Sequence, residues 1–212
     1  MSVVFSISAD GRSVAEALIE DAGEAEALLA AGREAGSDLA WAHAAADLSA
    51  LGFRQTWGYR RLEGPSAGAA GSGGGPAGAG QAPDVGPLPA AEDSAQLWAE
   101  AFRGQWGHKT PEQWPFDLPA GTVTLALRLD GRPVGVCRVE PDTGLIDGPG
   151  LVAECRDAAG YASLLAAAIA VVRTPTATLE SWGDGPDRVE VCERFGLVTA
   201  QYRPGWEFDL RS

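Results

Sequence analysis

The chain has little positive charge. Its 212 residues include a single lysine, Lys109, and Lys+Arg number 16 against 29 Asp+Glu, for a formal net charge of −13. Nucleic-acid affinity depends on many cationic contacts with phosphates, so this balance argues against a nucleic-acid partner. The acidity would attract a cationic substrate such as an amine, and it is equally a common means of keeping a protein soluble.

Cysteines and long apolar runs are also scarce. The three cysteines, Cys137, Cys155 and Cys192, are odd in number and form no C-x-x-C pair, which argues against a disulfide framework or a zinc site. No apolar stretch is long enough to cross a bilayer, and Met1 is not followed by the pattern of a signal peptide. We therefore expect no membrane partner and a cytoplasmic protein with reduced thiols.

The first sixty residues predict a β-α-β-α-β unit. Ser13-x-x-Glu16 has the spacing of a capping box, so a helix is expected to begin at Ser13. Arg12, just before it, could meet a phosphate, although Asp10 and Glu16 oppose an anion there. The expected elements are a strand at 3–7, this helix up to Gly36, a strand at Leu39–Ala42, a short helix at Ala45–Leu51 and a strand at Arg54–Leu62.

A segment rich in glycine, alanine and proline separates this unit from the rest. Residues 64–89 have no charge before Asp84 and no bulky side chain before Val85, so they cannot bury enough apolar surface to fold alone. The expected organisation is a first unit over residues 1–63, a flexible linker over 64–89 and a second unit over 90–212.

The second unit predicts a mixed α/β layer with helices on both faces. Helix starts are expected at Asp93 and Thr110, and Asp130-Gly131 is the turn of a hairpin between strands Thr122–Leu129 and Arg132–Val139. A third strand then leads into a helix whose apolar stripe comprises Tyr161, Leu164, Leu165, Ala168, Ile169 and Val172. The remaining expected elements are a strand at Ala177–Trp182, a helix at Asp187–Phe195, and closing strands at Val198–Arg203 and Trp206–Leu210.

The two units share an internal pattern. Ser37–Leu62 and Thr176–Arg203 both predict strand, short helix, glycine and strand, and Tyr59-Arg60 in the first corresponds to Tyr202-Arg203 in the second. The first unit lacks the preceding strands, so its sheet edge needs a partner. We expect its strands to pack against the second unit or against a second copy in a homodimer.

Three stretches of the second unit resemble the GCN5-related N-acetyltransferase (GNAT) superfamily, and specifically its tandem members. They are Leu97–Trp114, the hairpin Leu125–Val139, and the strand, loop and helix around Leu151–Ala162. The resemblance implies a GNAT-like mixed central sheet flanked by helices, preceded by a partial GNAT-like unit. It also implies acetyl-CoA, or another acyl-CoA, as cofactor.

The resemblance also implies positions for that cofactor. Amides of Leu151, Val152 and Ala153 would hold the pantetheine arm and the acyl oxygen. The loop and helix start at Ala158, Ala159, Gly160, Tyr161 and Ala162 would hold the diphosphate.

The sequence departs from the family pattern at two of these places. Asp157 stands where the family has an arginine, and it is either a carboxylate that repels the diphosphate or simply a helix cap. Cys192 stands where the family has its acidic tyrosine, and it is either a proton donor or a buried structural cysteine. Glu140 and Asp147 are the candidates for the base, with solvated strand-end carboxylates as the alternative.

These observations favour an acyl-CoA-dependent N-acetyltransferase that acts on a small amine. The departures at Asp157 and Cys192 favour a second hypothesis, a catalytically inactive GNAT-like protein that binds or assembles.

Overall fold

The computed structural model describes residues 1–8, 11–66, 84–88, 91–102, 119–182 and 186–211. The first half of the chain contains β1 (Val4–Ile7), β2 (Ser13–Leu18), α1 (Ala22–Glu34), β3 (Leu39–His43), a 3₁₀ turn (Ser49–Leu51) and β4 (Arg54–Pro65). The second half contains β5 (Asp84–Pro87), α2 (Ala91–Ala101), β6 (Val123–Leu129), β7 (Arg132–Glu140), β8 (Leu145–Leu151), a 3₁₀ turn (Ala153–Cys155), α3 (Ala158–Val171), β9 (Thr176–Trp182), α4 (Pro186–Arg194) and β10 (Val198–Asp209).

All ten described strands form one sheet, in the order β1-β2-β3-β10-β4-β9-β8-β7-β6-β5. The last strand of each half lies beside the preceding strand of the other half, since β10 pairs with β3 and β4 pairs with β9. The strands β4 and β10 also pair with each other, and there Tyr59 is opposite Arg203 and Arg60 is opposite Tyr202. The expectation that the first half packs against the second is therefore confirmed.

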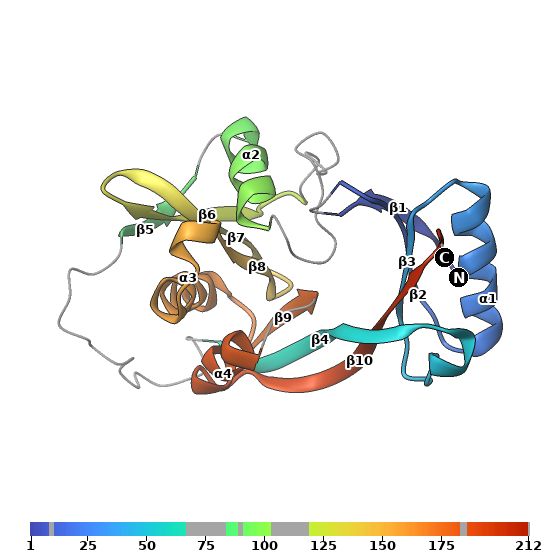
Figure 1. Ribbon diagram of the computed structural model, residues 1–212. Helices are drawn as coiled ribbons and strands as arrows, with labels where there is room; N and C mark the ends of the chain where they lie inside the picture. The colour runs from blue at the N-terminus through green and yellow to red at the C-terminus, as the bar shows by residue number, and fades with distance from the viewer. Residues whose placement is uncertain (9–10, 67–83, 89–90, 103–118, 183–185, 212) are drawn as a thin grey trace.

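Helices cover both faces of the second half of the sheet (Figure 1). A Cβ added to Gly150 would meet the ring of Phe102 just after α2, whereas one added to Gly135 would meet Leu164 on α3. Gly150 pairs opposite Val136, the neighbour of Gly135, so the two glycines face opposite sides of the sheet. We call these sides the α2 face and the α3 face.

The prediction that a helix begins at Ser13 is wrong, because that segment is strand β2. Its backbone pairs with β3, and the Ser13 backbone nitrogen and hydroxyl both donate to the Asp38 carboxylate. The helix begins eight residues later, where the Asp21 carboxylate accepts from the Glu24 amide at 3.0 Å. Ser13-x-x-Glu16 matched the capping spacing, but pairing across the sheet satisfies the same polar groups.

Other boundaries also differ from the sequence expectations. The helix expected at Ala45–Leu51 is only a single 3₁₀ turn at Ser49–Leu51, and α2 begins at Ala91 before Asp93. The expected linker begins within strand β4 and its last part includes strand β5. Residues 67–83 lie outside the described residues, as does the helix start expected at Thr110. The two expected closing strands are one strand, β10, with a register shift between Arg203 and Gly205.

Local signals in the second half are confirmed. Asp130 and Gly131 both have positive φ, 51° and 78°, as the two-residue hairpin turn requires. The expected inner stripe of α3 is buried, and Gly196 ends the α4 segment at a φ of 78°. The core of this half is therefore built from the residues that the helical period indicated.

Candidate active site

The parallel strands β8 and β9 pair at only three positions and then diverge. The paired residues are Leu145 with Thr178, Ile146 with Leu179, and Asp147 with Glu180. Beyond Asp147 the strand continues through Gly148-Pro149-Gly150, in which Gly148 has a φ of 97° and Pro149 has no N–H to donate. The register between β7 and β8 also shifts there, so β8 turns away from β9.

The equivalent parallel pair in the first half does not diverge. The strands β2 and β3 pair at five successive positions, from Val14 with Leu39 to Leu18 with His43. At the end of this pair the Glu16 carboxylate lies 3.1 Å from Nε2 of His43, whose side chain is buried. Within the part of the chain that the structure describes, the parallel strands of the second half diverge and those of the first half do not.

Two acidic residues are neighbours at the last paired position of β8 and β9. Asp147 is exposed and Glu180 is half-buried, and their register places both on the α2 face. The hydroxyl of Tyr59, from the first half of the chain, donates to Oε1 of Glu180 at 3.0 Å. Burial, together with the charge of Glu180, raises the pKa of Tyr59 to about 12, so this hydroxyl stays protonated and keeps donating.

Arg138 completes this group on the α2 face. It is opposite Asp147 in the register of β7 and β8, and its guanidinium lies 4.3 Å from the ring centroid of Trp98 on α2. Burial lowers the pKa of Arg138, and the nearby Asp147 carboxylate counteracts that shift. The face thus combines an arginine, two carboxylates and a tyrosine hydroxyl within neighbouring strands.

Tyr161 and Cys192 meet where α3 packs on α4. The Tyr161 hydroxyl lies 3.7 Å from Sγ of Cys192, and both side chains are buried. The Arg188 guanidinium lies 5.3 Å from the centroid of the Tyr161 ring. Cys192, a candidate acid from the sequence, is therefore part of the core, and its side chain contacts a tyrosine from the neighbouring helix.

The loop between β8 and α3 has several of its amides already bonded. The Val152 amide donates to the Val134 carbonyl at 2.9 Å, and the Tyr161 amide donates to the Asp157 carbonyl at 3.2 Å. The Gly160 amide donates to Oδ1 of Asp157 at 2.6 Å, so Asp157 caps α3. This capping was one of the two alternatives for Asp157, and the carboxylate occupies a donor that a phosphate would use.

The expected cofactor residues differ in their exposure. Leu151, Val152 and the side chain of Tyr161 are buried, Gly160 and Ala162 are half-buried, and Ala153, Ala158 and Ala159 are exposed. Among these residues, Ala153, Ala158 and Ala159 are therefore the ones most accessible to a large anionic ligand.

Arg156 is an exposed residue whose guanidinium is nevertheless bonded to two backbone carbonyls. Its Nε donates to the Leu151 carbonyl at 3.1 Å, and its Nη2 donates to the Ala101 carbonyl at the end of α2 at 3.2 Å. Partial burial lowers the pKa of Arg156, as does the neighbouring Arg188. The guanidinium ties the end of β8 to the end of α2.

Glu140 lies at the turn that joins β7 to β8. It is opposite Leu145 in the register, and its carboxylate accepts a hydrogen bond of 2.9 Å from the Thr143 hydroxyl. The divergence of β8 and β9 lies toward the other end of β8, so the structure does not bring Glu140 together with Cys192 or with the loop before α3. Asp147 is the sequence candidate that lies at the divergence.

Sequence reasoning missed Glu180, Tyr59 and Ser181. Glu180 and Ser181 lie in a predicted strand, and only pairing with β8 shows that they flank the divergence. Tyr59 belongs to the first half of the chain and reaches Glu180 because β4 pairs with β9. A repeat search that also considered exchange of strands between the halves could have found Tyr59.

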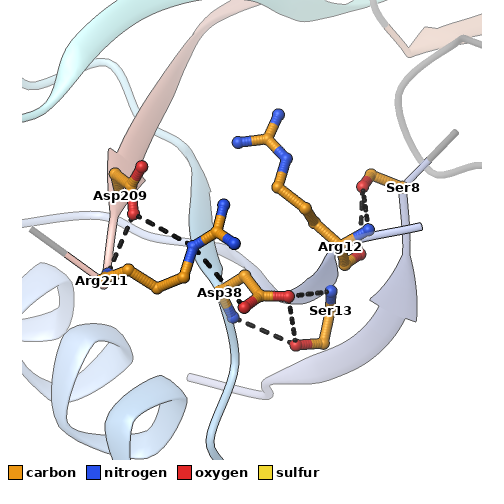
Figure 2. A network of polar contacts seen from close by, with 6 residues as sticks. All are labelled: Ser8, Arg12, Ser13, Asp38, Asp209 and Arg211. Atoms are coloured by element: carbon orange, nitrogen blue, oxygen red, sulfur yellow. Dashed lines mark hydrogen bonds and ion pairs between the residues drawn. The ribbon is translucent and has the colours of Figure 1, made fainter. Parts of the chain in front are cut away.

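Arg12, the phosphate candidate of the first half, belongs to a polar network (Figure 2). Its backbone amide donates to Oγ of Ser8 at 3.1 Å, and the neighbouring Ser13 is bonded to Asp38. The hydrogen bond from the Ser13 backbone amide is the main cause of a lowered pKa at Asp38, with the Ser13 hydroxyl, Arg211 and Arg12 contributing. These contacts join β2, β3 and the end of β10, and so have a structural role.

The sheet with its diverging parallel pair is the GNAT fold. A GCN5-related N-acetyltransferase from Kribbella flavida has a TM-score of 0.52 at 20% identity, over 95% of this chain and 82% of its own. One from Sphaerobacter thermophilus has a TM-score of 0.60 at 15% identity, over 93% of this chain and 74% of its own. A tandem GNAT protein from the clavulanic acid biosynthesis pathway has a TM-score of 0.50 at 12% identity, over 89% and 70%.

No family model matches the chain, and no curated protein matches it in sequence. Structural similarity at such low sequence identity shows the fold alone. One fold hosts many functions, so the function has to be argued from the site. Within the described residues, no group of His, Cys, Asp or Glu side chains is arranged to hold a metal ion. None of the described helices is long and apolar enough to span a membrane.

Proposed function

We propose that the chain transfers an acyl group from an acyl-CoA, acetyl-CoA in the simplest case, to a small amine where β8 and β9 diverge. One observation carries this proposal: the pairing of the two strands ends at two neighbouring acidic residues, Asp147 and Glu180. Carboxylates at such a point attract a cationic amine and accept its proton. The acyl-CoA would supply an activated thioester.

The residues present fit the thioester arm of this donor better than its diphosphate. The divergence leaves the ends of β8 and β9 without each other as hydrogen-bond partners. The Asp157 carboxylate, in contrast, binds the Gly160 amide where the diphosphate would lie. The interaction of a negative charge with a helix N-terminus, for which Asp157 and the diphosphate would compete, is worth about 0.3–1 kcal/mol, so the competition weakens binding without abolishing it.

The chain's own groups for proton transfer lie on the α2 face. On the α2 face, Asp147 or Glu180 removes the proton that an ammonium must lose before its nitrogen bonds to the acyl carbon. The carbon–sulfur bond of the thioester would then break, and CoA would leave as a thiolate that takes up a proton from water. Tyr59 holds the Glu180 carboxylate in place through its hydrogen bond of 3.0 Å. Arg138 and Trp98 line the same face beside Asp147.

A specific observation also favours the alternative of a non-catalytic binding or assembly protein. Asp157 occupies the Gly160 amide, and Arg156 occupies the Leu151 carbonyl at the end of β8. Cys192, at the position of the family's acid, is buried against Tyr161. In this alternative the protein keeps the fold, but hydrogen bonds within the chain occupy the backbone groups that would otherwise bind the donor.

Titration calorimetry with acetyl-CoA separates the two functions. Measurable binding supports the acyltransferase, and no heat at millimolar ligand supports the non-catalytic protein. Release of free thiol from acetyl-CoA, followed across a panel of small primary amines, then tests transfer.

The carboxylate pair is tested in the same assay. We expect Asp147→Asn or Glu180→Gln to lower the transfer rate by about 10²-fold or more, the usual contribution of a general base. Glu140→Gln is the matched control, because Glu140 is a carboxylate on the adjacent turn that hydrogen-bonds Thr143. A loss in Glu140→Gln alone would move the base to that turn.

A further inference from the structure

The side chain of Ser181 is a buried hydroxyl without a hydrogen-bond partner. It is 2% exposed, and its Oγ makes no hydrogen bond to any part of the chain that the structure describes. A hydroxyl removed from water normally finds a partner, because leaving it unbonded is costly. An orphaned group of this kind needs an explanation, and a ligand is one.

Ser181 lies one residue beyond the last pair of β8 and β9. Had the pairing continued past Asp147 and Glu180, Gly148 would be its neighbour, and Gly148 has no side chain. On its other side β9 remains paired, with Ser181 opposite Arg60 of β4. The side of Ser181 that lacks a neighbouring strand is therefore the side of the divergence.

The alternation of β9 places Ser181 and Glu180 on opposite faces of the sheet. Glu180 is on the α2 face, where it bonds Tyr59. Ser181 shares the α3 face with Leu179, which pairs with Ile146 in the core. Two neighbouring residues thus place a carboxylate on the α2 face and a hydroxyl on the α3 face.

We propose that Ser181 binds the thioester arm of the acyl-CoA donor, donating its hydroxyl hydrogen to a carbonyl oxygen of that arm. The proposal rests on the proposed function and assigns the donor to the α3 face and the amine to the α2 face. The donor's carbonyl oxygens then supply the partner that the hydroxyl lacks in the free protein.

The test compares Ser181→Ala with Ser6→Ala. Ser6 on β1 is a matched control, because it is also buried, at 5% exposed, and its Oγ also lacks a partner, at the far edge of the sheet. Titration calorimetry measures the affinity of both variants and of the unmodified chain for acetyl-CoA and for CoA. Urea denaturation without ligand measures their stability.

We expect Ser181→Ala to weaken acetyl-CoA binding about three- to tenfold, the usual effect of one neutral hydrogen bond. Ser6→Ala should leave the affinity unchanged, and neither variant should lower stability. A loss for acetyl-CoA alone supports a bond to the acyl carbonyl, and an equal loss for CoA supports a bond to a pantetheine carbonyl.

Three outcomes overturn the proposal, and they are distinguishable. If the unmodified chain binds neither ligand, the proposed function fails and this assignment with it. If the chain binds acetyl-CoA and Ser181→Ala binds it equally well, the assignment alone fails. An equal loss in Ser6→Ala would show a general effect of buried serines.

Discussion

Oδ1 of Asp157 lies 2.6 Å from the backbone nitrogen of Gly160, so the chain's own carboxylate accepts a hydrogen bond from an amide in the first turn of α3. The positive end of the helix dipole is thereby partly neutralised before any ligand arrives. The strength of donor binding should therefore depend on residue 157.

Replacing Asp157 should strengthen CoA binding. Asp157→Asn keeps a capping oxygen and removes the charge, so we expect a gain of about two- to fivefold with little change in stability. Asp157→Arg should gain more, since a cation would then face the diphosphate, while loss of the cap costs about 1 kcal/mol of unfolding free energy. Calorimetric titration with CoA measures the affinity, and urea denaturation measures the stability.

Asp142→Asn is the control for charge alone. Asp142 is exposed in the turn between β7 and β8, where it pairs with Arg173 at 3.1 Å. This variant should bind CoA as the unmodified chain does. Unchanged or weaker binding by Asp157→Arg would show that the loop before α3 does not receive the diphosphate.

The Tyr59–Glu180 contact should make stability depend on alkaline pH. The pKa of Tyr59 is raised to about 12, whereas tyrosine in an unfolded chain titrates near 10. The folded state therefore holds this proton more tightly, and the resulting stability is fully present below about pH 10 and is lost as the pH rises toward 12. Urea denaturation at a series of pH values should show a steeper fall for the unmodified chain than for Tyr59→Phe.

Tyr202→Phe is the matched control for this series. The Tyr202 ring is 43% exposed, and its contact with Arg60, 4.6 Å from the ring centroid, does not need the hydroxyl. It should keep the alkaline slope of the unmodified chain. A Tyr59→Phe variant with that same slope would contradict the raised pKa.

Thiol labelling should distinguish the three cysteines. Cys137 and Cys192 are buried, and burial raises the pKa of Cys137 well above its ordinary value, so neither should react in the native state. Cys155 is half-buried in the turn before α3 and should react. Ellman's reagent should therefore titrate one thiol in the native chain, none in Cys155→Ser, and all three after unfolding of the unmodified chain.

The same reaction reports on the loop. Acetyl-CoA bound at this loop should slow the labelling of Cys155, because the turn Ala153–Cys155 lies between β8 and α3. Rapid labelling of Cys192 in the native chain would contradict its burial and would restore it as an accessible acid.

The contact between β4 and β10 should not tolerate a side chain at Gly58. A Cβ there would overlap the Arg203 carbonyl oxygen and would lie 2.9 Å from the Tyr202 ring. We expect Gly58→Ala to lower the free energy of unfolding by about 1–3 kcal/mol, as overpacking does. A Cβ at Gly86, in the edge strand β5, would meet only the end of the Arg128 side chain, at 3.4 Å. Gly86→Ala should therefore change the free energy of unfolding by less than about 0.5 kcal/mol. Urea denaturation that finds equal losses would contradict this close approach.

The sequence predicted the elements of the second half better than those of the first. The stripe on α3 and the Asp130-Gly131 turn are strong signals, because each depends only on residues a few positions apart. Ser13-x-x-Glu16 gave a false signal, since Ser13 meets Asp38, twenty-five residues away, and β2 pairs along β3. The true cap at Asp21 also has a carboxylate three positions on, so spacing alone could not choose between them.

The candidate site was predicted in part. The resemblance to the GNAT superfamily indicated Asp147 and the loop before α3, and the structure puts Asp147 at the divergence. The roles proposed for Glu180 and Ser181 depend on where the pairing of β8 and β9 stops, and Gly148-Pro149-Gly150 marks that place without showing which strand lies alongside. Tyr59 was out of reach for the same reason, because its partner is 121 residues away.

The sequence by itself therefore determined the local structure: turns, caps, the buried face of each helix and the alternation of each strand. The tertiary structure alone decided which strands are neighbours, and thus the exchange of β4 and β10 and the meeting of Tyr59 with Glu180. The physical reason is that side-chain periodicity specifies which face of a strand is buried, whereas backbone hydrogen bonds between strands can form with any strand that the remaining chain brings alongside.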